Sequence, residues 1–278
     1  MIKYGIISDI HGNLEALKRV RDDMKEQGVD RVICLGDIIS KGAHGHECIE
    51  IIKTLADAVM RGNNDLKYTK SLDEIAGEPD FDYDYFYWTQ KQLTTDDIKF
   101  LRGLPMCCEF MLSGRLVRCF HASPDDFNKS VFNFDDYETK LELFNPTEFT
   151  TDATADMVVY GHTHHLGLEK FFGRTLVNVG SVGNSLNLIT DPYYNAMKVS
   201  DFTQAEYVIL SGEDGEKVGD IAVEFRTVSY DKNKELDGHD LRGYKGDVYR
   251  NEIIFGEYRN PERMQQKFNQ LNNKGNRA

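Results

Sequence analysis

The sequence predicts an α/β protein in which a parallel β-sheet is followed by a mainly antiparallel segment. In the first sixty residues, short β-rich runs alternate with stretches whose apolar residues recur at helical spacing. From Met106 onward the hydrophobic period changes to two, which is typical of antiparallel strands. The chain has 278 residues, enough to bury a sizeable core.

The first segment predicts three strands joined by two helices. The strands are expected at residues 3–8, 31–35 and 58–61. The first helix places Leu17, Val20 and Met24 on one face after Asn13, a suitable N-cap, and the second helix covers 48–55. This β-α-β-α-β order predicts a parallel sheet with right-handed crossovers. Ligands of such sheets bind at the carboxyl ends of the strands.

Residues 66–105 are aromatic and acidic and predict a helical insertion that stops at Gly103 and Pro105. Its aromatic residues either stack on a nucleotide base or pack on the core as a helical cap; they are Phe81, Tyr83, Tyr85, Phe86, Tyr87 and Trp88. Beyond it, Ser113–Gly114 predicts a hairpin turn between two strands. Further strands are expected at 156–160, 174–181, 205–210 and 221–230.

These elements predict one domain over residues 1–230 and an extension of unknown role over 231–278. The extension is polar and charged, and a short helix is expected after Asn260 and Pro261, with Met264, Phe268 and Leu271 on one face.

Net charge, apolar runs and cysteine content argue against several classes of protein. Lys and Arg number 33 and Asp and Glu 46, a formal net charge of −13, which disfavours an extended nucleic-acid partner. No apolar run is long enough to span a membrane, and no secretory signal is visible, so a cytoplasmic protein is expected. The five cysteines form neither a C-x-x-C pair nor an even framework, which indicates free thiols. The oligomeric state stays open.

Polar residues with metal-binding side chains follow the apolar strands at their carboxyl ends. They are Asp9, His11, Asp37, Asn63, His121, His162 and His164. Oxygen and imidazole ligands suit Mn²⁺, Fe, Ni²⁺ or Zn²⁺. Seven ligands are too many for one ion and fit two ions that share a carboxylate. Taken singly, each residue is more often a loop, cap or turn residue than a metal ligand. Together, in one order, they favour a metal centre.

This order resembles that of the calcineurin-like metallophosphoesterase superfamily, whose motifs run D-x-H, G-D, G-N-[HD], a later His and G-H-x-H. The segments "LGDIISKG", "HECIE" and "NVGSVGN" most resemble those of the small bacterial and archaeal phosphodiesterase branch. The resemblance covers roughly residues 1–230. It implies two packed mixed β-sheets flanked by helices, a four-layer α/β/β/α sandwich.

The resemblance assigns one metal to Asp9, His11 and His164, and a second to Asn63, His121 and His162, with Asp37 bridging them. Within "GHTH", residues i and i+2 of an extended segment point to the same side, so both histidines can reach adjacent ions. The implied cofactor is two divalent ions per chain, with Mn²⁺ preferred. The implied reaction is attack on phosphorus by a hydroxide that bridges the two metals.

Several positions depart from the family pattern. Asn64 stands where many members carry a histidine that protonates the leaving group, so His44 or His46 is a candidate replacement. Ser40 and Lys41 replace the Asp-Arg pair of the protein-phosphatase branch. Asn64 and His44 are therefore the candidate catalytic positions, and Asn13 and Lys41 the candidate substrate-binding residues. The Gly180–Ser181 turn is expected to face the ligand histidines.

The sequence thus predicts a dimetal-dependent phosphodiesterase that hydrolyses small nucleotides or dinucleoside polyphosphates. The alternatives are a phosphomonoesterase or protein phosphatase, and a non-catalytic scaffold on the same fold. The retention of all seven ligands argues against a scaffold.

Overall fold

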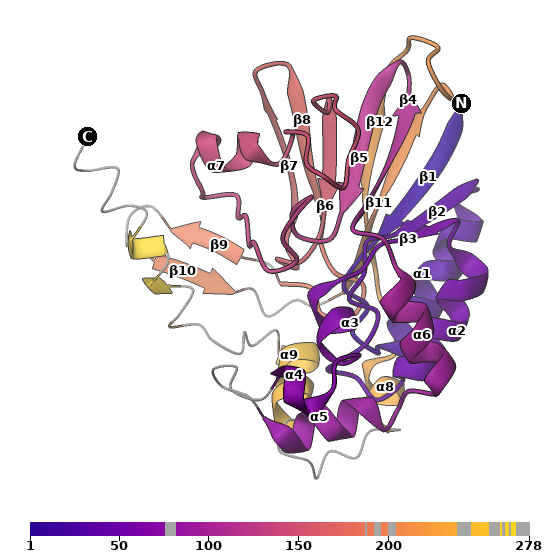
Figure 1. The fold of residues 1–278 in the computed structure, drawn as a ribbon, viewed down its shortest axis with the longest axis vertical. Helices are drawn as coiled ribbons and strands as arrows, with labels where there is room; N and C mark the ends of the chain where they lie inside the picture. Colours follow the sequence, from indigo (N-terminus) through magenta and orange to yellow (C-terminus); the bar gives the residue numbers. More distant parts are fainter. Residues whose placement is uncertain are drawn as a thin grey trace.

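The computed structural model describes residues 1–75, 82–186, 188–191, 196–199, 204–237, 246–255, 262, 265–266 and 268–270. Two five-stranded sheets pack face to face, and helices lie on their outer sides (Figure 1). Both sheets mix parallel and antiparallel pairs, which confirms the predicted fold class. Among these residues, no helix is both long enough and apolar enough to cross a membrane.

The first sheet has the strand order β12-β11-β1-β2-β3. Its parallel strands are β1 (Ile2–Ile7), β2 (Arg31–Cys34) and β3 (Ala58–Val59), connected by α1 (Leu14–Glu26) and α2 (Gly45–Leu55) as expected. The hairpin of β11 (Ala205–Gly212) and β12 (Ala222–Val228) completes this sheet by pairing antiparallel to β1. Strands from the two ends of the domain therefore lie side by side.

Helix α1 shows why the local prediction succeeds. Asn13 Oδ1 accepts a hydrogen bond from the Ala16 backbone N–H at 3.0 Å, which caps the first turn. Leu17, Val20 and Met24 are buried against the sheet. Burial of such an apolar stripe, rather than propensity alone, is what stabilises a surface helix.

The second sheet has the order β4-β5-β6-β8-β7. Its strands are β4 (Cys107–Leu112), β5 (Arg115–Phe120), β6 (Met157–Tyr160), β7 (Leu166–Phe171) and β8 (Arg174–Val179). The predicted hairpin is confirmed, because Ser113 and Gly114 both have positive φ, 52° and 73°, between antiparallel β4 and β5. A small separate sheet pairs β9 (Leu188–Asp191) with β10 (Ala196–Val199).

The expectation of a mainly antiparallel second segment is wrong for the centre of this sheet. β6 pairs in parallel with both β5 and β8, and the β11–β12 hairpin belongs to the other sheet. A period of two shows that one face of a strand is buried, but it carries no information about the direction of its neighbours. The long connection from β5 to β6, which includes α7 (Tyr137–Glu142), is what makes the parallel pairing possible.

Apolar side chains fill three layers of this sandwich. Ile6, Ile33, Val159 and Val177 belong to the cluster between the sheets. A second cluster lies between the first sheet and its helices, and a third lies on the outer face of the second sheet, where Phe144 follows α7. The two sheets are thus fixed against each other, with their strand ends at one edge.

The 66–105 segment is helical in its described part. It contains the end of α3 (Asn63–Lys67), α4 (Leu72–Ile75), α5 (Tyr83–Gln90) and α6 (Thr95–Gly103). Phe86 is buried in the core, and the Tyr85 ring stacks on Trp88 with 5.7 Å between centroids. These contacts correspond to the cap interpretation, whereas base stacking stays a prediction. Phe81 lies outside the described residues.

The extension continues with α8 (Lys232–Asp237) and α9 (Gly246–Phe255). α8 lies against α1, where the Glu15 backbone N–H donates to Glu235 at 3.2 Å, and the Tyr249 hydroxyl lies 3.1 Å from the same carboxyl. Phe268 is described and buried, whereas the other residues of the helix expected there, Asn260, Pro261, Met264 and Leu271, lie outside the described residues.

Candidate metal centre

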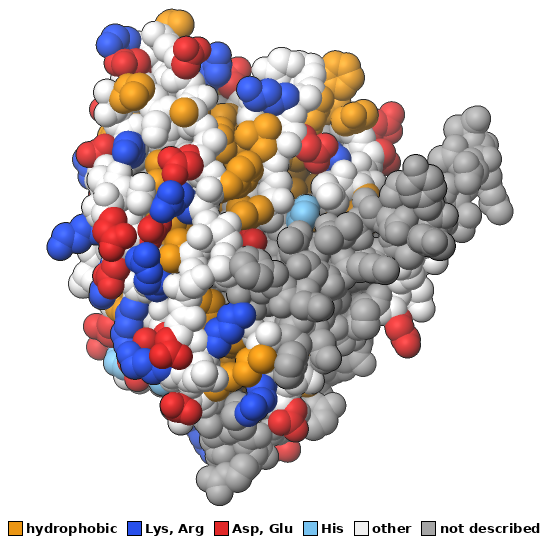
Figure 2. All heavy atoms as spheres, turned by 180° about the vertical axis from the view of Figure 1, so that it is seen from behind, with side chains coloured by type: hydrophobic (Ala, Val, Ile, Leu, Met, Phe, Trp, Pro, Cys, Tyr) orange, Lys and Arg blue, Asp and Glu red, His pale blue; other side chains and the backbone are white. Residues whose placement is uncertain are grey.

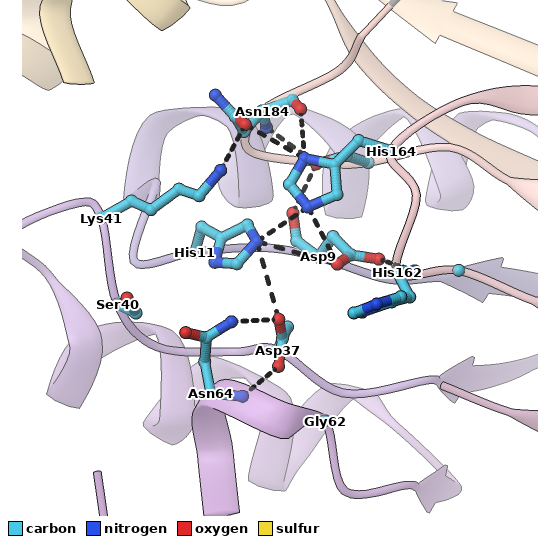
Figure 3. A network of polar contacts seen from close by, with 12 residues as sticks. Asp9, His11, Asp37, Ser40, Lys41, Gly62, Asn64, His162, His164 and Asn184 are labelled. Carbon is cyan, nitrogen blue, oxygen red and sulfur yellow. Dashed lines mark hydrogen bonds and ion pairs between the residues drawn. The ribbon is translucent and has the colours of Figure 1, made fainter. Parts of the chain in front are cut away.

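The candidate ligands meet where the two sheets end. Figure 3 shows Asp9, His11, Asp37, His162 and His164 together. Asn63 and His121 both contact His162. The first sheet brings one group, because Asp9 and His11 follow β1, Asp37 follows β2 and Asn63 follows β3. The second sheet brings His121 after β5 and the GHTH histidines after β6. The carboxyl ends of parallel strands share one edge, and face-to-face packing of the sheets places both edges together. The metal role of these residues stays a prediction.

Asp9, His11 and His164 form the first cluster. His164 Nε2 lies 3.0 Å from His11 Nε2 and 3.1 Å from Asp9 Oδ1. The other ring nitrogens face backbone carbonyls, with His11 Nδ1 3.3 Å from Ile39 O and His164 Nδ1 2.6 Å from Asn184 O. A carbonyl only accepts, so each Nδ1 carries the proton and each Nε2 presents a lone pair. Two lone pairs 3.0 Å apart repel each other unless a cation lies between them.

Asn63, His121 and His162 form the second cluster. Asn63 Oδ1 lies 3.0 Å from His121 Nε2 and 3.1 Å from His162 Nδ1, and the two ring nitrogens are 3.2 Å apart. The far nitrogen of His162, Nε2, lies 3.0 Å from the Ser130 hydroxyl, which orients the ring. Sequence reasoning missed Ser130, since nothing local distinguishes this loop serine from others.

Asp37 lies between the two clusters. Its Oδ2 is 3.8 Å from His11 Nε2 and 3.6 Å from His121 Nε2, which suits a bridging ligand. Burial, together with the neighbouring charge of Asp9, raises the pKa of Asp37 to about 7. Asp9 also lies near both groups, since its carboxylate joins Asp37 and His121 in a second candidate set. Two buried carboxylates this close favour a bound cation.

The protonation states of the ligand side chains also suit divalent cations. Burial lowers the pKa of His162 to about 3 and holds that of His11 well below its usual range, so both rings are neutral near pH 7. Burial opposes ionisation of Asp9, yet the histidines around it hold its pKa well below the usual range. Asp9 Oδ1 is buried without a hydrogen-bond donor among the described residues. A buried carboxylate oxygen without a donor, beside neutral imidazoles, is a site for a metal ion.

The backbone around the ligands is held in an unusual conformation. Asp9, His11, Asp37, His162 and His164 all have positive φ, between 52° and 66°. Such non-glycine residues cost about 1–3 kcal/mol each and are retained where they aim functional side chains.

Two glycines permit the approach of these loops. A Cβ on Gly62 would lie 2.1 Å from Asp37 Oδ1, and one on Gly161 would lie 2.2 Å from Ser8 Oγ. Both distances are far inside van der Waals contact. The glycines of "RGNND" and "YGHTHH" are therefore required by the close passage of side chains from β1 and β2 loops.

A family model describing the calcineurin-like phosphoesterase superfamily domain matches residues 2–201. The chain belongs to the calcineurin-like phosphoesterase superfamily. An uncharacterized protein of Methanocaldococcus jannaschii is 29% identical over 237 residues, which cover 82% of this chain and 88% of that protein.

Solved structures show the same fold. A metallophosphoesterase from Sphaerobacter thermophilus is 24% identical, with a TM-score of 0.63 over 90% of this chain and 98% of its own. A hypothetical protein from Pyrococcus horikoshii is 19% identical, with a TM-score of 0.72 over 92% of this chain and 99% of its own.

Within this superfamily fold, Asn64 and His44 occupy different environments. The Asn64 backbone N–H donates to Asp37 Oδ1 at 2.8 Å, and its side-chain amide donates to Asp37 Oδ2. His44 is half-buried before α2, and no hydrogen bond joins its side chain to the ligands among the described residues. His46 bonds Asp97 of α6 at 2.8 Å. Asn64 thus holds the candidate bridging carboxylate, and a catalytic role of His44 stays a prediction.

The two candidate substrate-binding residues also have protein partners. Asn13 is fully buried, and its side-chain amide donates to Gly183 O at 2.9 Å and to the Tyr230 hydroxyl at 3.1 Å. Lys41 Nζ donates to Asn184 Oδ1 at 2.6 Å. Asn13 would reach a substrate only by giving up these bonds, whereas Lys41 lies beside a candidate metal ligand. Substrate binding by either residue stays a prediction.

Two further residues hold the ligand loops, and sequence reasoning missed the first of them. Both oxygens of buried Asp65 accept backbone N–H groups from the Asp37 and Gly62 loops. The Ser181 hydroxyl donates to the backbone oxygen of Asp9 at 2.7 Å, so the turn expected to face the histidines instead contacts the β1 loop. Asp65 could have been found from the sequence, because an acidic residue at the third position of a helix is typical of an N-terminal cap.

Proposed function

We propose that this chain is a dimetal-dependent phosphodiesterase acting on small nucleotides or dinucleoside polyphosphates, with Mn²⁺ as the preferred ion. The supporting observation is the pair of ligand clusters on either side of Asp37. Asp9, His11 and His164 would hold one ion, and Asn63, His121 and His162 the other. When bound, such a pair clamps phosphoryl oxygens and lowers the pKa of a water nucleophile toward neutrality.

Charge around the site favours a diester over a monoester. A phosphomonoester is a dianion near neutral pH, whereas a diester carries one negative charge. Lys41 is a cation near the site, and its Nζ lies 3.5 Å from the carboxylate of Glu252, which offsets its charge. Among the described residues, no arginine hydrogen-bonds or pairs with the candidate ligands. Beyond the two ions, the side chains add little uncompensated positive charge, so a dianion gains less extra stabilisation here than in an arginine-lined site.

The chain's own residues position the reacting groups. The backbone carbonyls of Ile39 and Asn184 fix the His11 and His164 rings, and Ser130 fixes the ring of His162. Asn64 donates to both oxygens of Asp37 and so limits its rotation. Groups held in this way lose little freedom when a substrate binds, which is a main source of catalytic rate.

The leaving group is expected to be a good one. The Asn64 amide has no acidic proton to donate, and general acid catalysis is typically worth about 10²–10⁴-fold. Nucleotides and phosphoanhydrides release stable anions and need such help least.

The partner is expected to be a small molecule rather than a nucleic acid. The net charge of −13 repels an extended phosphate backbone. On the face in Figure 2, acidic and basic side chains are interspersed over the described surface. A small phosphorylated substrate needs only the local field of the metal centre.

Metal-reconstituted protein tests this proposal. We expect a higher kcat/KM for bis(4-nitrophenyl) phosphate and for a dinucleoside polyphosphate than for 4-nitrophenyl phosphate, with activity lost on chelation. Faster hydrolysis of the monoester would favour a phosphomonoesterase instead. Hydrolysis of none of them by fully loaded protein would favour the scaffold alternative.

A further inference from the structure

The C-terminal extension contributes a buried carboxylate beside the metal centre. Glu252 lies on α9 and is 2% exposed, and its Oε2 accepts a hydrogen bond from Asn184 Nδ2 at 3.1 Å. The same oxygen lies 3.5 Å from Lys41 Nζ. These contacts join the extension to a residue that touches a candidate ligand, since Asn184 lies against His164 (Figure 3).

The partners of Asn184 determine which way its side-chain amide points. A carboxylate only accepts hydrogen bonds, so Glu252 requires the Nδ2 group on its side. An ammonium only donates, so Lys41, 2.6 Å from Oδ1, requires the oxygen on the other side. Both charged partners therefore require the same orientation of the amide. In the reverse orientation, the amide oxygen would face the Glu252 carboxylate and the amide N–H₂ would face the Lys41 ammonium.

This orientation gives the Nδ1 proton of His164 a second acceptor beside the Asn184 backbone oxygen. Asn184 Oδ1 lies 3.0 Å from His164 Nδ1, and the Asn184 backbone oxygen lies 2.6 Å from it. With two acceptors facing it, Nδ1 carries the proton and Nε2 presents its lone pair toward His11 and Asp9. A flipped amide would instead turn its N–H groups toward the Nδ1 proton.

The extension is anchored so that Glu252 stays in place. Tyr249, one turn earlier on α9, contacts Glu235 of α8 and packs with Leu236 and Ile253. α8 in turn lies against α1, the helix that follows the Asp9–His11 loop. A chain of direct contacts, from α9 to α8 and from α8 to α1, therefore connects Glu252 to the loop after β1 that carries Asp9 and His11.

We propose that Glu252 is a positioning residue for the ion held by Asp9, His11 and His164, acting through Asn184. The inference deepens the proposed function and rests on its metal site. Residues that orient a metal-binding histidine typically change metal affinity by about 10–100-fold when they are removed. Glu252→Leu should therefore weaken one of two Mn²⁺ sites by about 10–100-fold and leave the other unchanged.

The test is Mn²⁺ binding by isothermal titration calorimetry, together with ¹⁵N NMR of histidine-labelled, metal-free protein. His164→Gln assigns the His164 signals by their absence. Glu252→Gln retains an acceptor for Asn184 and should keep binding near the wild-type level. Asp247→Asn, an exposed carboxylate on the same helix, is the matched control and should change nothing. In Glu252→Leu, the His164 ¹⁵N signals should shift, because the Asn184 side-chain oxygen is no longer held against Nδ1 while the backbone oxygen still accepts its proton.

Circular dichroism first confirms that each variant is folded. Should Glu252→Leu not fold, Glu252→Ala, which removes the carboxylate without adding volume, is expected to give the same loss. Unchanged affinity at both Mn²⁺ sites and unchanged His164 ¹⁵N signals in a folded variant would overturn the proposal. Neither readout involves a substrate. Wild-type protein that binds two ions but hydrolyses nothing would refute the proposed function and leave this inference standing.

Discussion

Asp65 should be essential to the geometry of the metal centre although it is not a ligand. Its Oδ2 accepts the backbone N–H groups of Asp37 at 2.8 Å and Gly62 at 3.0 Å, and its Oδ1 accepts that of Ile38 at 2.9 Å. The carboxyl is completely buried. It therefore ties the loop after β2, which carries Asp37, to the loop after β3, which carries Asn63.

The cost of removing Asp65 follows from these three bonds. A buried donor left without an acceptor costs about 1–3 kcal/mol, so Asp65→Ala, which leaves three, should lower the free energy of unfolding by about 3–9 kcal/mol. That is a large part of the roughly 5–15 kcal/mol of a typical domain. Asp65→Asn keeps one oxygen, which can serve Asp37 and Gly62, but its amide N–H₂ then faces the Ile38 donor. That variant should lose about 1–3 kcal/mol.

Urea unfolding of the metal-free protein measures the loss of stability, and elemental analysis measures bound metal. Asp65→Asn should lower both, because the Asp37 loop is no longer held. Asp73→Asn, an exposed carboxylate on α4, is the matched control. Stability within about 0.5 kcal/mol of wild type, the range expected of ordinary surface substitutions, would refute the reasoning.

Three further predictions concern Asp37, Asn64 and Glu235. Asp37→Ala should lower the occupancy of both metal sites because Asp37 lies between the clusters; full two-ion occupancy by elemental analysis would contradict a bridge. Asn64→His should speed hydrolysis of aryl diesters with poor leaving groups more than that of diesters with good ones. The measurement is the hydrolysis rate of diesters whose leaving groups have graded pKa values. A wild-type rate that depends only weakly on leaving-group pKa, and that His44→Ala leaves unchanged, would show the reasoning to be wrong. Burial raises the pKa of Glu235 to about 7, so ionisation opposes folding, and stability should fall as pH rises from about 4.5 through 7. Glu235→Gln should remove this loss in melting experiments, and parallel pH profiles of the two proteins would exclude it.

Several parts of the fold could be predicted because they depend on local sequence pattern. The α/β class, the capped helix after Asn13 and the Ser113–Gly114 hairpin all follow from hydrophobic period and turn chemistry, which act over a few residues. The candidate ligands could be named in advance for a related reason. Each follows an apolar run directly, and strand ends in such folds share an edge.

The neighbours of each strand and the residues that support the ligands could not be predicted, because they depend on long-range packing. The β11–β12 hairpin pairs with β1 more than two hundred residues away, because backbone pairing is set by packing of whole sheets and not by side-chain period. Asn184 and Glu252 are 68 residues apart, and neither carries a local signal for its role. Their effect on His164 depends on side chains meeting in a buried space, and such long-range contacts leave no pattern in a single sequence.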